Sequence, residues 1–253
     1  MKHVDNLLDS RGGINDRGIY YATMGMLNNL YQLDNIANNL ANVNTNGYKK
    51  DSVSFKAVME KEFYSYDGKT QKIKKIGNME TATVVDDVRP ILFSGGFEET
   101  DNQYDFAIEG SGFFKIQRGE EFYYTRNGEF KLDSQGFLVT NDGDYVLNRN
   151  NGKILINNDF QVLPDGKVSG TDYEIAVFDL NSTKKYGYNL FTGEEVAASD
   201  FKVMQKTLEH SNVDALNEMI KMISASRQFG ILEKAVQTSD SLNARIIETV
   251  SKI

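Results

Sequence analysis

The feature that most constrains the fold is a change of hydrophobic period along the chain. Near both ends, over residues 19–44 and 211–253, apolar residues recur at spacings of three and four, as on one face of a helix. Between them, over residues 93–180, apolar residues alternate with polar or small ones, as half-buried strands require. The sequence therefore predicts a β domain flanked by a helix at each end.

The N-terminal helical segment is predicted over residues 19–50, after a polar leader of residues 1–18 that contains Arg11-Gly-Gly13. Asparagines crowd the end of this segment and Gly47 follows them, as expected where a helix stops, because Asn and Gly tolerate the left-handed conformation. The apolar stripe consists of Ile19, Met26, Leu30, Leu33, Ala37 and Leu40.

The C-terminal helical segment is predicted over residues 208–253, which contain one Gly and no Pro. Ser211 and Asp214 have the spacing of a capping box, which marks the start of the helix. The regular alternation of spacings gives a period of 3.5, which is typical of a coiled-coil seam. The seam residues are Leu232, Ala235, Ser239, Leu242, Ile246, Thr249 and Ile253.

The central β domain is predicted over residues 93–207. Turn signals recur in it, and Asn127-Gly128 and Asn151-Gly152 are the strongest predictions of hairpin turns. Residues 51–92 are read as an extended arm, a linker or a short β-ribbon. The expected fold class is thus α+β, with N- and C-terminal long helices forming a coiled-coil-like stalk and a central all-β domain of hairpins.

Composition excludes several functions. The net charge of −8 disfavours nucleic acid as a partner, because such binding relies on clustered Lys and Arg. No Cys and only two His are present, which excludes a thiolate site and a multi-histidine metal site. The acidic pairs are adjacent residues that would point to opposite faces of a strand, and no Gly-x-Ser-x-Gly, complete calcium loop or dinucleotide motif is present. No catalytic, cofactor-binding or metal site is therefore expected. No segment is apolar enough for a membrane span and no secretory signal is visible, so any export would use a route without a cleaved signal.

The two apolar stripes must be buried somewhere. They can pack within one chain, which is the commoner case, or against neighbouring subunits, which leads to a polymer if the rotation between subunits does not close. Periodicity alone leaves both possibilities open.

Motif matches favour the second possibility. The segment from Ala37 to Lys50, which reads Ala-Asn-Asn-Leu-Ala-Asn-Val-Asn-Thr-Asn-Gly-Tyr-Lys-Lys, resembles the N-terminal signature of the flagellar rod and hook protein family. The segments 100–114 and 124–139 are similar to that family's β domain, and Leu208-Glu-His-Ser-Asn-Val213 with the helix after it is similar to its C-terminal signature. Size and Asn243-Ala-Arg245 look most like a proximal rod protein.

The resemblance implies a structural subunit of the bacterial flagellar basal-body rod, exported without a cleaved signal peptide by the flagellar type III export apparatus. It would polymerise with other copies and other axial proteins into the periplasmic tube that transmits torque, and it would not be an enzyme. The assembly interface expected from the motifs and stripes comprises Met26, Leu30, Leu33, Ala37, Asn38, Asn39, Leu40, Asn42, Asn44, Gly47, Leu232, Ala235, Leu242, Ile246, Val250 and Ile253.

Two alternatives stay open. One is a distal rod or hook-type axial subunit. The other is a periplasmic β-rich glycan-binding module, which exposed Tyr and Phe clustered on one β face with polar groups between them would favour.

Overall fold

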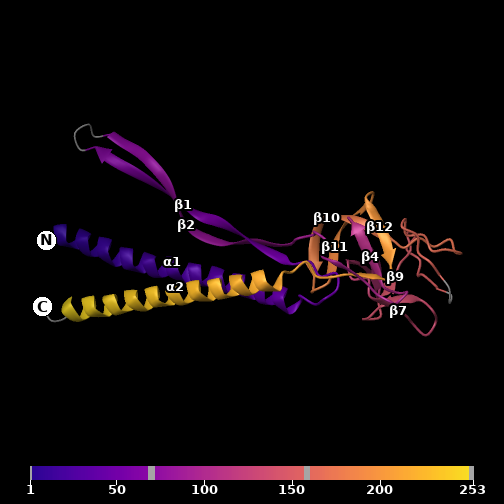
Figure 1. The fold of residues 1–253 in the computed structure, drawn as a ribbon. Helices are drawn as coiled ribbons and strands as arrows, with labels where there is room; N and C mark the ends of the chain where they lie inside the picture. The colour runs from indigo at the N-terminus through magenta and orange to yellow at the C-terminus, as the bar shows by residue number, and fades with distance from the viewer. Residues whose placement is uncertain (1, 68–71, 157–159, 251–253) are drawn as a thin grey trace. The chain divides into compact units, whose positions relative to one another are not determined.

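The structure is a computed structural model that describes residues 2–67, 72–156 and 160–250, with side chains described outside 2–18, 57–84, 246 and 250 (Figure 1). The chain forms two compact units. Unit 1 consists of Met1–Ala37, Val53–Val88 and Met219–Ile253, and unit 2 of Asn38–Ser52 and Arg89–Glu218.

One helix stands near each end of the chain. Helix α1 spans Lys2–Ala41, so its helical conformation includes most of the residues assigned above to a polar leader, and helix α2 spans Ala215–Val250. Within unit 1 the two helices lie side by side (Figure 1), and a Cβ at Gly25 of α1 would stand 3.2 Å from Leu232 Cδ1 of α2. The missing side chain of Gly25 therefore allows the close approach. None of the described helices contains a stretch long and apolar enough to cross a membrane.

Unit 1 also contains most of a two-stranded sheet, formed by β1 (Asp51–Asp67) and β2 (Lys72–Pro90). The Ser54 hydroxyl donates a hydrogen bond to the Asp87 carbonyl oxygen at 3.2 Å, which ties the two strands together. Of the structures considered for residues 51–92, the described part is thus a β-ribbon.

Unit 2 is built around a seven-stranded sheet. Its strands are β5 (Phe113–Arg118), β6 (Glu121–Thr125), β7 (Phe130–Leu132), β8 (Leu138–Thr140), β9 (Tyr145–Val146), β10 (Val177–Tyr186) and β11 (Leu190–Ala197). They lie in the order β10-β11-β6-β5-β9-β8-β7, and β10 also pairs with β5. The described strands of this sheet pair antiparallel with their neighbours.

Two short antiparallel pairs complete unit 2. Strand β4 (Phe106–Gly110) pairs with β12 (Phe201–Gln205), and β3 (Phe97–Glu99) pairs with β13 (Thr207–Glu209). These pairs bring the start of the β domain next to its end, so that segments about a hundred residues apart become neighbours.

The core of unit 2 lies on both faces of strand β5, whose first four residues are all buried. Phe114 and Ile116 point into the larger apolar cluster, with residues such as Phe106 and Leu138. Phe113 points to the opposite face and packs on Phe191, with ring centroids 4.9 Å apart. The alternation seen in the sequence is real, but this strand is covered on both sides rather than half-buried.

Local turn predictions are partly confirmed. Asn151-Gly152 closes a tight turn in which the Asn148 N–H donates to the Gly152 carbonyl at 2.8 Å. Asn127-Gly128 is not a hairpin turn, because the strands on either side of it, β6 and β7, are not neighbours in the sheet. The N-cap of α2 is Asp214 rather than Ser211, since Asp214 Oδ1 accepts a hydrogen bond from the Asn217 N–H at 3.1 Å.

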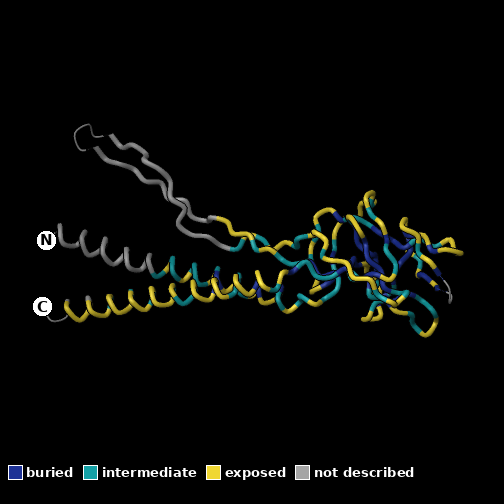
Figure 2. Tube along the Cα trace, in the orientation of Figure 1, coloured by how far each residue is buried: buried dark blue, intermediate teal, exposed yellow. Residues whose placement is uncertain are grey.

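The predicted coiled-coil-like stalk is wrong. The chain has one helix near each end and a large central β-rich domain, and within the described part of α2 Ala225 is the only buried apolar residue. Ala235 and Leu242 of the predicted seam are exposed, whereas the less exposed positions farther along the helix include Ser239 and Asn243. A polar stripe of this kind cannot form a continuous apolar seam. Figure 2 shows α2 exposed along most of its described length.

Candidate functional site

Each terminal helix has two apolar faces, and only one of them is covered within the chain. On α1 the covered face holds Asn29 and Ile36, which are 5% and 3% exposed. Tyr20, Leu27 and Tyr31 lie on the opposite side of the helix, at 49%, 44% and 57% exposure. Because their spacings are seven and four, these three side chains share one face. We call them the outer face of α1.

Helix α2 repeats this arrangement. Its covered side contains Ala225 and Leu232, and the latter contacts the position of Gly25 on α1. On the other side, Ile220, Ile223 and Ile231 are 53%, 53% and 67% exposed. We call these three the outer face of α2. Exposed Ile at helical spacing is unusual in a chain with no partner.

The predicted assembly residues on the two helices divide into partly buried and exposed ones. Met26, Leu33, Leu40 and Leu232 are partly buried, whereas Leu30, Ala37, Ala235 and Leu242 are exposed. Ile253 and the side chains of Ile246 and Val250 lie outside the described residues. Neither outer face follows from the predicted apolar stripes. A second apolar stripe was visible in each helix, but periodicity does not say which stripe a neighbour within the chain will cover.

The Asn-rich signature forms a different kind of site, inside unit 2. The Asn39 side-chain amide donates to the Asp51 carbonyl at 3.0 Å and accepts from the Asp51 N–H at 2.9 Å, as a strand neighbour would. The Asn42 amide donates to the Asn38 carbonyl at 2.8 Å. The first of these amides pairs with the backbone at the start of β1, and the second bonds a carbonyl in the last turn of α1.

The predicted assembly residues also include Asn38, Asn39, Asn42, Asn44 and Gly47 from this signature. Asn38 and Asn44 are exposed, and Asn42 is partly buried. Asn39 and Gly47 are instead buried in unit 2 and take part in its internal packing. The Gly47 N–H donates to the Glu209 carbonyl at 2.6 Å.

A buried ion triad holds the two signatures together. Lys49 Nζ lies 2.5 Å from Glu209 Oε1. One guanidinium nitrogen of Arg126 lies 3.2 Å from Glu209 Oε2, the other oxygen of the same carboxylate. All three side chains are at most 3% exposed. Burial lowers the pKa of Lys49 and of Arg126 below their usual values, and the Glu209 carboxylate opposes both shifts. Removing water from three charges is costly, so the triad depends on its geometry.

Further hydrogen bonds complete this geometry. Lys49 Nζ also donates to the Phe93 carbonyl at 2.9 Å, and Arg126 donates to the carbonyls of Ile108 and Gly110 at 2.8 and 2.5 Å. The Asn212 side chain accepts from the Lys50 N–H at 2.8 Å. We call the set Asn39, Gly47, Lys49, Arg126, Glu209 and Asn212 the hub.

The hub positions the ends of both helices. Residues 38–41 of α1 and 215–218 of α2 belong to unit 2, and each lies within a few residues of a hub member. The hub therefore lies next to the last turn of α1 and the first turn of α2 within unit 2. Sequence reasoning did not find it, because Lys49 and Glu209 are 160 residues apart and no periodic pattern links them. The available signal was that both residues lie within the quoted signatures.

Comparison with known proteins matches three parts of the chain to family models. Residues 19–49 match the flagella basal body rod protein model, residues 107–170 match the flagellar hook protein FlgE/F/G D1 domain, and residues 204–249 match the flagellar basal body rod FlgEFG protein C-terminal model. The first and third of these matches contain the hub residues Lys49 and Glu209.

Curated relatives match over nearly the whole length. The flagellar basal-body rod protein FlgG of Bacillus subtilis is 33% identical, over 91% of this chain and 98% of the relative. The flagellar basal-body rod protein FlgG of Borreliella burgdorferi is 32% identical, over 89% of this chain and 96% of the relative. The flagellar basal-body rod protein FlgF of Caulobacter vibrioides is 30% identical, over 94% of this chain and 99% of the relative. Because this identity extends across both terminal helices and the β domain, the chain belongs to the flagellar basal-body rod protein family.

Proposed function

We propose that the protein is a structural subunit of the flagellar basal-body rod, of the proximal type, and that it polymerises with other copies and other axial proteins through the outer faces of α1 and α2. The observation that carries the proposal is the exposure of six large apolar side chains, Tyr20, Leu27, Tyr31, Ile220, Ile223 and Ile231. Moving a half-exposed Ile or Leu out of water contributes about 1 kcal/mol, so several together support association.

Two of the predicted assembly residues extend these surfaces. Leu30 and Leu242, at 44% and 49% exposure, lie at the borders of the two outer faces. The proposed role is structural and involves no catalytic residue. The proposal includes the periplasmic location and delivery by the flagellar type III export apparatus without a cleaved signal peptide, both of which follow from the family resemblance.

The first test is a charge on the outer face of α2. Ile223→Asp is expected to abolish incorporation into the rod and swimming motility, because a carboxylate would have to be buried against a neighbouring subunit. Leu242→Asp is expected to act in the same direction. The purified variants should keep the wild-type melting temperature, because both side chains are about half exposed in the single chain.

Gln228→Asp is the matched control, since it adds the same charge to the same helix at an exposed position beside the outer face. It should preserve motility. If Ile223→Asp cells swim like wild type, the assignment of this face to assembly is wrong.

A second expected result concerns the free monomer. Trypsin should cut α2 at the exposed Arg227 and Lys234 well before it cuts unit 2 at the exposed Lys131 and Lys202, because the helix buries little apolar surface in a single chain. Mass spectrometry of timed digests would identify the cuts. Survival of α2 in a dilute monomer after unit 2 has been cut would show that packing within the chain is sufficient.

A further inference from the structure

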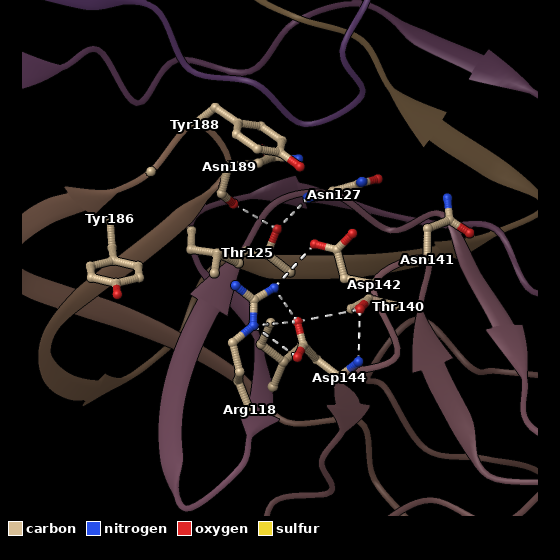
Figure 3. A pocket seen from close by; sticks show the side chains of 13 residues that line it. Arg118, Thr125, Asn127, Thr140, Asn141, Asp142, Asp144, Tyr186, Tyr188 and Asn189 are labelled. Atoms are coloured by element: carbon tan, nitrogen blue, oxygen red, sulfur yellow. Dashed lines mark hydrogen bonds and ion pairs between the residues drawn. The ribbon is translucent and has the colours of Figure 1, made fainter.

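A pocket of about 260 Å³ opens on unit 2, and no residue of the hub or of the outer faces is among those that line it. Four segments form it: the end of β5, the end of β6 with the residues after it, the loop between β8 and β9, and the turn between β10 and β11. Its lining includes Arg118, Asn127, Asn141, Asp142, Tyr186 and Tyr188 (Figure 3).

An ion pair forms the floor of this pocket. Arg118 makes a two-pronged contact with Asp144, with Nε 2.9 Å from Oδ1 and a terminal nitrogen 2.6 Å from Oδ2. The same terminal nitrogen lies 3.1 Å from Asp142 Oδ2. Asp144 is held in turn by Thr140, whose hydroxyl accepts from the Asp144 N–H at 3.1 Å. The planar groups are therefore fixed before any ligand arrives.

Two aromatic rings border this floor. Tyr186 and Tyr188 flank Gly187 in the turn between β10 and β11, and they are 54% and 57% exposed. In Figure 3, Tyr186 lies to the left of Arg118 and Tyr188 lies above it. Tyr186 is supported by Tyr123, with ring centroids 5.0 Å apart. Exposed tyrosines offer a flat apolar face and a polar tip at little cost in side-chain entropy.

Free polar groups complete the lining. Within the described residues, the Asn141 side-chain amide has no hydrogen-bond partner, and the Asn127 amide nitrogen likewise donates to none of them. The Asp142 side chain is 60% exposed and uses only one of its oxygens on Arg118. The pocket thus presents both donors and acceptors beside the two rings.

The chemistry of the lining selects the class of ligand. One guanidinium faces two carboxylates, so an anion would meet net negative charge, and a cation would have to compete with Arg118 for Asp142. A purely apolar ligand would leave the polar groups unpaired. A neutral ring with one apolar face and several hydroxyls, which donate and accept together, satisfies all the groups. The volume is below the roughly 300–1,000 Å³ of pockets for drug-sized ligands, which limits the occupant to about one sugar ring.

We propose that this pocket binds one ring of a neutral saccharide, with the sugar packed on Tyr186 or Tyr188 and its hydroxyls bonded to Asp142, Arg118 and Asn141. This activity goes beyond assembly and uses none of the outer-face residues.

The test is a titration of the isotopically labelled full-length monomer with two probes, the β-1,4-linked tetramer of N-acetylglucosamine and maltotetraose, followed by two-dimensional NMR. Saturable shifts of the pocket amides are expected with at least one of the two. Tyr188→Ala and Asp142→Asn should each weaken that binding about tenfold, since each removes one stacking surface or one charged acceptor.

Tyr31→Ala is the matched control, because Tyr31 has the same 57% exposure as Tyr188 but lies on α1, and it should leave sugar binding unchanged. Absence of saturable shifts with both sugars would overturn the proposal, as would wild-type affinity in both pocket variants. Binding of tetralysine through the same residues without binding of either sugar would also overturn it and assign the pocket to a cation. Motility of the pocket variants reads out assembly separately.

Discussion

Replacing Gly47 by Ala is expected to lower the free energy of unfolding of unit 2 by about 4 kcal/mol or more. Gly47 has a φ of +68°, a conformation that L residues rarely adopt. A Cβ at this position would also stand 2.3 Å from the Arg126 carbonyl carbon and from the Asn127 nitrogen. Both neighbours are backbone atoms, so the loop carrying Arg126 would have to shift. Urea unfolding of the full-length monomer, followed by circular dichroism, measures the loss.

Gly119→Ala separates the two causes. Gly119 has nearly the same φ, +63°, but nothing lies within 4 Å of the Cβ that would be added. In this variant the free energy of unfolding should fall only by the cost of the left-handed backbone conformation for Ala, about 1–2 kcal/mol. Equal losses in the two variants would show that the contact with residues 126–127 does not exist in solution.

Replacing Glu209 by Gln is expected to cost about 3–5 kcal/mol of unfolding free energy, because it leaves Lys49 and Arg126 buried without a compensating charge. Glu209 is the carboxylate that contacts both cations, at 2.5 and 3.2 Å, and its side chain is fully buried. The same urea titration measures the effect. A parallel loss of motility is expected, because the variant unfolds rather than because an assembly surface has changed.

Two further variants make this test specific. Adding Lys49→Met to Glu209→Gln should restore part of the lost stability, since the double variant removes one uncompensated cation. Glu98→Gln breaks an exposed pair with His210, whose partner atoms are 2.7 Å apart, and should change stability by no more than about 1 kcal/mol. If Glu209→Gln and Glu98→Gln behaved alike, the triad would contribute nothing beyond an ordinary surface pair.

The hub and the outer faces should therefore be distinguishable by experiment. Changes at Gly47 or Glu209 are expected to lower both stability and motility, because these residues hold the β domain and the helix ends together. A charge at Ile223 is expected to stop assembly while the melting temperature stays the same. On this proposal, stability and assembly depend on different residues of the same chain.

Hydrophobic period was a sound guide to the type of each element. The alternation around Phe114 and Ile116 predicted strands, and spacings of three and four predicted a helix near each end, because side-chain direction follows directly from backbone geometry. Period was a poor guide to what covers each face. Strand β5 is covered on both sides. Helix α2 has apolar residues on two opposite sides, and the predicted seam does not coincide with either of them.

The family could be read from ordered sequence matches that include Lys49 and Glu209, and side-chain chemistry dictated many local conformations. The contacts between residues 160 positions apart that form the ion triad, and the apolar face of each helix that is left exposed, emerged only from the folded chain. The physical reason is that period reports the direction of a side chain relative to its own backbone, whereas contact and burial depend on packing between distant segments.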